Sequence, residues 1–195
     1  MEKKSKGFVP KICLWAGAGL LVAAAVLMLV WQWGIQSSEK QAADYLQTIY
    51  SLIPEPQGAA VEARRDNTMA VLSVDGTDFV GILEMPRYES ALPVCGSWGN
   101  PDEYPCRFSG SVYDGSIQIG ATSQKGQYDF YQEISVGDSL FFTDMEGNRY
   151  SYRVTQLHYA DHADQTALQR ETADLTLFIK NVYDFEYLIL FCQAG

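Results

Sequence analysis

Three kinds of side chain in this sequence are suited to chemistry on a ligand or a substrate. They are the thiols of the cysteines, the imidazoles of the histidines and the carboxylates of a short acidic segment. A thiolate attacks carbonyl and disulfide groups, and a nearby imidazole can serve as its acid or base. The cysteines are Cys13, Cys95, Cys106 and Cys192, and the histidines are His158 and His162.

The spacing of these residues favours structural interpretations. His158 follows a predicted strand and His162 lies in an acidic loop, so solvated loop histidines are the favoured interpretation, although either could approach a groove. Cys192 is almost terminal and has no base nearby in the sequence. The acidic residues Asp161, Asp164 and Glu171 lack the ordered alternation of a dedicated calcium loop. We therefore predict no metal and no cofactor.

Composition excludes some functions. The chain has 195 residues, a net charge of -10 and 47% hydrophobic residues, which excludes a disordered tail. A pI near 4.6 argues against nucleic acid as a partner, since phosphate binding needs a basic surface.

An uncharged segment near the N-terminus predicts a membrane anchor. Residues 12–35 are apolar except for Gln32, and a helix needs about 20 such residues to cross a bilayer. The preceding tail, residues 1–11, holds four lysines and one glutamate. By the positive-inside rule the tail is cytoplasmic and the rest of the chain is outside the cell membrane, which it crosses once.

A cleaved signal peptide is the alternative, but the apolar core is too long and no Ala-x-Ala site follows it promptly. Removing the tail leaves 10 basic and 23 acidic residues, so the acidity belongs to the exported part. That part holds three cysteines, Cys95, Cys106 and Cys192. An odd number leaves at least one thiol unpaired within the chain, and the sequence does not say which two could form a disulfide.

The exported part divides into a helix with a linker, 36–77, and a domain, 78–195. Apolar residues at helical spacing predict a short juxtamembrane helix over 38–52, which Pro54 and Pro56 end. The domain shows a series of short strands without long helices, which predicts an all-β closed barrel. The predicted strands are Phe79–Met85, Ile117–Gly120, Ser139–Thr143, Tyr150–His158, Leu175–Ile179 and Tyr187–Cys192, and the longest irregular connection is Gly96–Phe108.

Five sequence motifs follow one another along this domain: FVGILEMP (79–86), LPV (92–94), PCRFSGSVY (105–113), GQYDFYQEISVGDSLFFTDMEGNRYSYRV (126–154) and DLTLF (174–178). Taken in series, they resemble the sortases, the membrane-anchored cysteine transpeptidases of Gram-positive bacteria, and class B-like enzymes above all. The resemblance implies an eight-stranded sortase β-barrel. For an active member it also implies binding of a Leu-Pro-x-Thr-Gly-like sorting signal, a thioacyl intermediate on a cysteine, and transfer to an amine of a cell-wall precursor or pilin.

That reaction uses a cysteine nucleophile, a histidine acid and an arginine that stabilises negative charge. Aligned without gaps, the family's histidine position is Thr122, its cysteine position is Lys180 and its arginine position is Tyr187. A shift by one residue recovers none of the three. The resemblance therefore predicts a pseudoenzyme without these catalytic residues, whose peptide groove would involve Thr122, Lys180, Tyr187, His158 and His162.

Three functions stay open on this interpretation. The first is a non-catalytic module at the cell surface that binds a sorting-signal peptide. The second is an active transpeptidase or hydrolase with relocated groups, for which Cys106, Cys192 or a Lys180–Thr122 pair are the candidates. The third is a factor that helps a sortase, a pilin or another surface protein to assemble.

Overall fold

The computed structural model describes residues 19–29, 44–54, 68–163, 168 and 173–195. The chain divides into two compact units, Met1–Ser38 and Glu39–Gly195, which are described separately. In the first unit, residues 19–29 are helical. Among the described residues, no helix is both long and apolar enough to cross a membrane. The rest of the predicted span, 12–18 and 30–35, lies outside the described residues, so the anchor stays a prediction.

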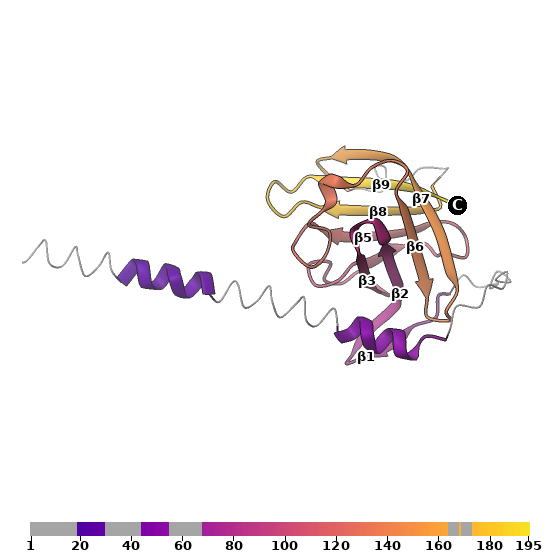
Figure 1. The fold of residues 1–195 in the computed structure, drawn as a ribbon, viewed down its shortest axis with the longest axis horizontal. Coiled ribbons are helices and arrows are strands. Elements are labelled where there is room, and N and C mark those ends of the chain that lie inside the picture. Colours follow the sequence, from indigo (N-terminus) through magenta and orange to yellow (C-terminus); the bar gives the residue numbers. More distant parts are fainter. Residues whose placement is uncertain (1–18, 30–43, 55–67, 164–167, 169–172) are drawn as a thin grey trace, which may run out of the picture. The chain divides into compact units, whose positions relative to one another are not determined.

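The second unit is an all-β barrel (Figure 1). The sheet runs in the order β1-β2-β3-β4-β5-β8-β9-β7-β6, and β2 also pairs with β6. The eight strands from β2 onward therefore form a closed ring, and β1 is an addition beside the start of β2. The strands are β1 (Leu72–Val74), β2 (Thr77–Met85), β3 (Ser90–Cys95), β4 (Cys106–Ser109), β5 (Ile117–Thr122), β6 (Ser139–Asp144), β7 (Arg149–Ala160), β8 (Leu175–Lys180) and β9 (Tyr187–Ala194).

Alternation along the strands sets the two faces of the barrel wall. Ala121, Ile179 and Leu188 belong to the buried core inside the ring. Since successive side chains on a strand point to opposite faces, their neighbours Thr122, Lys180 and Tyr187 lie on the outer face.

All six predicted strands are confirmed, and three unpredicted strands, β1, β3 and β4, are added. The irregular connection was expected to reach Phe108, but β4 begins at Cys106. This boundary was therefore wrong, because Cys106 pairs with Cys95 on one side and with Gly120 on the other. β1 lies within the segment predicted as a linker, and residues 55–67 of that segment are outside the described residues.

The short helix predicted over 38–52 is present over residues 44–52, and residues 38–43 lie outside the described residues. Its place next to a membrane stays a prediction. Ile49 is fully buried and packs with Phe79 and Ile82 of β2 and with Tyr104. The helix therefore covers the outer face of the barrel at β2.

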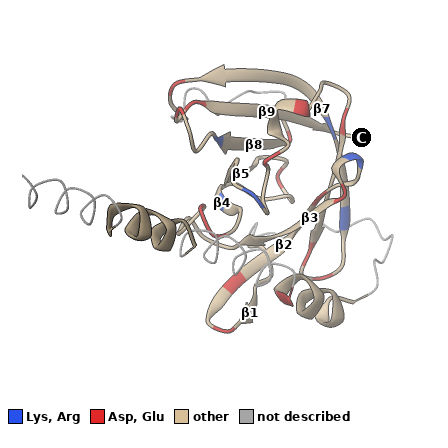
Figure 2. Cartoon of the chain, turned by 60° about the vertical axis from the view of Figure 1, so that its left-hand side comes forward, with Lys and Arg blue, Asp and Glu red and all other residues tan. Residues whose placement is uncertain are grey.

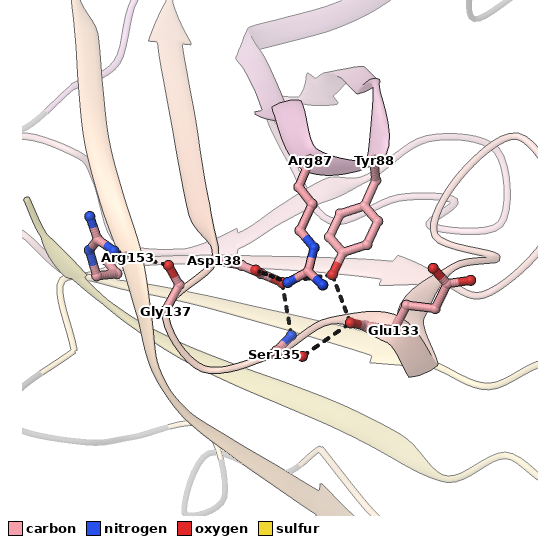
Figure 3. Close-up of polar contacts among 7 residues, drawn as sticks. All are labelled: Arg87, Tyr88, Glu133, Ser135, Gly137, Asp138 and Arg153. Carbon is pink, nitrogen blue, oxygen red and sulfur yellow. Dashed lines mark hydrogen bonds and ion pairs between the residues drawn. The ribbon is translucent and has the colours of Figure 1, made fainter.

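A polar network fixes the Val136–Asp138 turn between η2 (Tyr131–Glu133) and β6 (Figure 3). The Asp138 carboxylate accepts hydrogen bonds from Arg87 at 2.6 Å and from the Tyr88 hydroxyl at 2.7 Å, both in η1 (Pro86–Tyr88). It also accepts the Ser135 backbone N–H at 2.8 Å. Asp138 thus ties the turn to the end of β2.

Acidic residues are visible on this unit (Figure 2). Figure 2 shows acidic positions on several strand connections of the barrel, including the turn between β1 and β2, which holds Asp75 and precedes Asp78. Such a surface does not favour phosphate-bearing partners.

Candidate functional site

The three family positions come together in one row across the barrel wall. Thr122, the last residue of β5, pairs with Lys180 of β8, and Lys180 pairs with Tyr187, the first residue of β9. Residues paired across neighbouring strands present their side chains on the same face. The row therefore lies on the outer face, and the strands β5, β8 and β9 that carry it lie side by side (Figure 1).

A tight turn holds two members of the row in register. The Asn181 N–H donates to the Glu186 carbonyl at 2.8 Å, and the Phe185 N–H donates to the Asn181 carbonyl at 3.1 Å. Phe185 has a positive φ of 65°, which the turn requires and which side chains rarely adopt. This turn joins β8 to β9 and places Lys180 opposite Tyr187.

Thr122 is anchored by its backbone and not by its side chain. Its N–H donates to Gln127 Oε1 at 3.3 Å, and its carbonyl accepts the Tyr128 N–H at 3.3 Å. The residue is 1% exposed, and its hydroxyl has no hydrogen-bond partner among the described residues.

Lys180 and Tyr187 are partly exposed. The Lys180 Nζ lies 5.1 Å from the centre of the Phe185 ring, which is cation–π contact distance. Tyr187 packs against Phe178, with ring centres 6.5 Å apart. Tyr187 also lines a pocket of about 270 Å³ together with Tyr131, Gln132, Tyr159, Asn181, Asp184, Glu186 and Leu188.

A cluster of aromatic side chains covers the neighbouring row of the outer face, in which Gly120 of β5 pairs with Phe178 of β8. Trp98 is 47% exposed, yet its ring lies against Phe178 and Phe108, with centres 5.7 Å and 5.2 Å apart. A Cβ on Gly120 would lie 2.4 Å from Trp98 and 2.6 Å from Phe178. Only glycine at position 120 admits this packing, so the cluster and β5 fit together closely.

Both histidines are exposed. His158 pairs with Ile189, one row from Tyr187 on the same outer face, whereas His162 lies in the loop after β7. Among the described residues, no hydrogen bond joins either histidine to a cysteine. His158 therefore lies beside the predicted groove, and its imidazole has no hydrogen bond to a cysteine among the described residues.

The cysteines fall into two environments. Cys192 is fully buried in the barrel core, where burial raises the pKa of its thiol. Cys95 and Cys106 are paired on β3 and β4, and the thiols of Cys95, Cys106 and Cys192 are all free in this structure. No signal in the sequence indicated that Cys95 and Cys106 are neighbours, because a parallel strand pair has no local signature.

Metal binding was considered at the acidic loop. Asp161 is exposed, whereas Asp164 and Glu171 lie outside the described residues. In the described part of the chain, no cluster of three or more His, Cys, Asp or Glu side chains could hold a metal ion.

Comparison with known proteins shows which solved structures have a similar fold. No family model matches the chain, and no curated protein matches it. Among solved structures it resembles sortase A from Corynebacterium diphtheriae, with 12% identity, a TM-score of 0.54, and coverage of 83% of this chain and 84% of that one. It also resembles Clostridium perfringens sortase C in a structure with the C-terminal cell wall sorting motif, at 15% identity and a TM-score of 0.54, over 80% of this chain and 98% of that one.

Sortase C1 of GBS pilus island 1 is similar to the same degree, with 16% identity, a TM-score of 0.53, and coverage of 83% and 82% of the two chains. The chain therefore has a sortase-like fold, as the sequence resemblance implied. Likeness at this identity shows the fold alone, and the class B-like assignment stays a prediction.

Proposed function

We propose that this protein is a non-catalytic sortase-fold module that binds an extended peptide of the sorting-signal type at the cell surface. The supporting observation is the row Thr122, Lys180 and Tyr187. The sequence resemblance assigns these residues to the histidine, cysteine and arginine positions of the sortases, and they lie on adjacent paired strands. On this proposal the scaffold is kept, and the three reacting groups are replaced.

The replacements do not supply the missing chemistry. A threonine hydroxyl does not titrate near neutral pH as an imidazole does. A lysine at the cysteine position offers no thiolate for attack on a peptide carbonyl. Tyr187 supplies one neutral hydroxyl donor where arginine would supply a charged fork of several donors.

Features suited to binding remain around the row. Lys180 and Tyr187 are partly exposed, Trp98 presents part of its ring to solvent, and Tyr187 lines a pocket of about 270 Å³. Aromatic side chains beside a pocket are typical anchors for a bound peptide. The similar sortase C from Clostridium perfringens was solved with the C-terminal cell wall sorting motif, which suggests the same class of ligand here.

The proposal includes the location. The apolar segment 12–35 behind a lysine-rich tail supports a single membrane anchor, with the barrel outside the cell. A pilin or another surface protein that carries a sorting signal would then be the partner.

Calorimetry on the purified full chain with a Leu-Pro-x-Thr-Gly peptide tests this function. We expect binding without cleavage, also when a nucleophilic amine is added. Tyr187→Ala and Lys180→Ala should each weaken binding roughly fivefold or more. The matched control is Arg153→Ala. Arg153 lies near the start of β7, whereas Tyr187 pairs with Ala160 at the end of this strand, so the variant should bind as the unchanged protein does.

Absence of binding would refute the peptide-binding role. Cleavage that is lost on substituting Cys106 or Cys192 would refute the non-catalytic role and support the relocated transpeptidase instead.

A further inference from the structure

Cys95 and Cys106 form a pair that the proposed function does not use. Cys95 ends β3, Cys106 begins β4, and the two are direct partners in the parallel ladder. Neighbouring strands lie about 4.8 Å apart. A disulfide needs Cα atoms roughly 4.4 to 6.8 Å apart, so this pairing falls within the range.

The two thiols have unequal surroundings. The interaction between the two thiols is the first cause that raises the pKa of Cys95 and lowers the pKa of Cys106. The backbone of Gly99 and Asn100 also hydrogen bonds to the Cys106 sulfur and favours its thiolate, against the opposing effect of burial. When protonated, Cys106 can donate to the Tyr104 carbonyl at 3.3 Å.

The pair is reached through a pocket. Cys95 is partly exposed, and Cys106 is 1% exposed, but both line a pocket of about 290 Å³. Asp78 and Glu103 line the same pocket, so a small positively charged molecule is favoured there over an anion.

We propose that Cys95 and Cys106 form a dithiol site that exchanges with small, positively charged disulfides, with Cys106 attacking and Cys95 resolving. The Cys106 thiolate attacks one sulfur of the external disulfide, forms a mixed disulfide and releases one thiolate. Cys95 loses its proton and attacks the Cys106 sulfur, which releases the second thiolate. In sum, the protein dithiol and one external disulfide become a protein disulfide and two small thiols.

The resulting bond would close the loop 96–105. This loop carries Trp98, which covers Gly120 and Phe178. The Gln127 side chain also holds the loop, because it donates to the carbonyls of Pro101 and Asp102 at 3.1 Å each. Oxidation of the pair would therefore fix a loop that borders the outer face of the barrel.

Reaction of the reduced full chain with cystamine, a dicationic disulfide, tests the site by intact mass and peptide mapping. The unchanged protein should lose two hydrogen atoms, carry one Cys95–Cys106 bond and recover its original mass with dithiothreitol. Cys95→Ser should stop at one cysteamine adduct on Cys106. Cys106→Ser should slow the reaction roughly tenfold or more.

Cys192→Ser and Cys13→Ser are the matched controls, and both should react as the unchanged protein does. The proposal fails if cystamine leaves the chain unmodified, if a stable mixed disulfide accumulates in the unchanged protein, or if the bond forms with Cys192 or Cys13. It also fails if Cys95→Ser carries no adduct. None of these outcomes depends on peptide binding.

Discussion

At the scale of single residues, Asp138 shows how a buried carboxylate is held charged. Burial by itself would raise the pKa of Asp138, but hydrogen bonds from Tyr88, the Ser135 N–H and Arg87 lower it below its ordinary value of 3.8 (Figure 3). A lowered pKa in the folded state adds stability that is complete above the ordinary value. This stability is lost as pH falls through the lowered pKa.

Asp138→Asn should therefore reduce the free energy of unfolding at pH 7 by about 1.5 to 3 kcal/mol, the value of hydrogen bonds to a charged group. Because the variant lacks the titrating carboxylate, its loss of stability as pH falls below the ordinary value of 3.8 and through the lowered pKa should be smaller than that of the unchanged protein. Urea unfolding at several pH values measures both effects. The exposed Asp129→Asn is the control and should stay within about 0.5 kcal/mol; equal acid dependence in Asp138→Asn would contradict the assignment.

Thr122 and Ser123 are adjacent in the sequence, and both side-chain hydroxyls are buried. They differ in whether the hydroxyl is hydrogen bonded. The Ser123 hydroxyl accepts the Val182 N–H at 3.1 Å and donates to Asn181 Oδ1 at 3.4 Å, whereas the Thr122 hydroxyl has no partner among the described residues. Removing an unpaired buried hydroxyl relieves a desolvation penalty, while removing a paired one leaves its partners unsatisfied.

We expect Thr122→Val to unfold at the same denaturant concentration as the unchanged protein or a higher one. Ser123→Ala should lose about 1 to 3 kcal/mol in the same measurement. A loss of more than about 1 kcal/mol in Thr122→Val would mean that this hydroxyl makes a stabilising contact that the structure does not assign to it.

At the scale of elements, the helix over residues 44–52 is attached to the barrel by one side. Ile49 is fully buried against Phe79 and Ile82, whereas Leu52 is largely exposed. Ile49→Ala should cost about 2 to 5 kcal/mol in the free energy of unfolding, because it leaves a cavity in a packed cluster. Leu52→Ala on the same helix should change it by less than about 0.5 kcal/mol, and similar losses in both would contradict the packing.

The six predicted strands were accessible from the sequence because aromatic and branched residues alternate between turn formers. The strands β1, β3 and β4 could not be predicted from the sequence in this way. β1 has only three residues, β3 contains Pro93, and β4 is a four-residue strand whose pairing depends on distant partners. The missed pairing between β3 and β4 is what brings Cys95 to Cys106, so the pair was missed with it.

The structure shows how the three predicted site positions are arranged, and their role stays a prediction. The resemblance supplied the positions Thr122, Lys180 and Tyr187, and the pairing of β5, β8 and β9 then brought them into one row. The cover formed by Trp98 was not foreseeable, since Trp98 lies in an irregular loop far along the chain from Phe178.

At the scale of the whole molecule, the closed barrel brings together the three positions that the sequence resemblance assigns to the reacting groups of a sortase. Ring closure through β2 and β6 holds the strands that carry Thr122, Lys180 and Tyr187, whatever side chains occupy those positions. A fold can therefore be kept while its site changes, and function has to be argued from the site.

Covalent trapping tests this central claim most directly. A Leu-Pro-x-Thr peptide that ends in a chloromethyl ketone alkylates a thiol held at the position of a sortase nucleophile. We predict that the peptide sequence does not accelerate alkylation of the unchanged full chain over that by a chloromethyl ketone without this sequence, and that it does accelerate alkylation of Lys180→Cys at residue 180. Lys125→Cys, an exposed substitution outside the row, is the control and should not react at the same rate. Alkylation of Cys95, Cys106 or Cys192 in the unchanged protein that the Leu-Pro-x-Thr sequence accelerates would contradict the account.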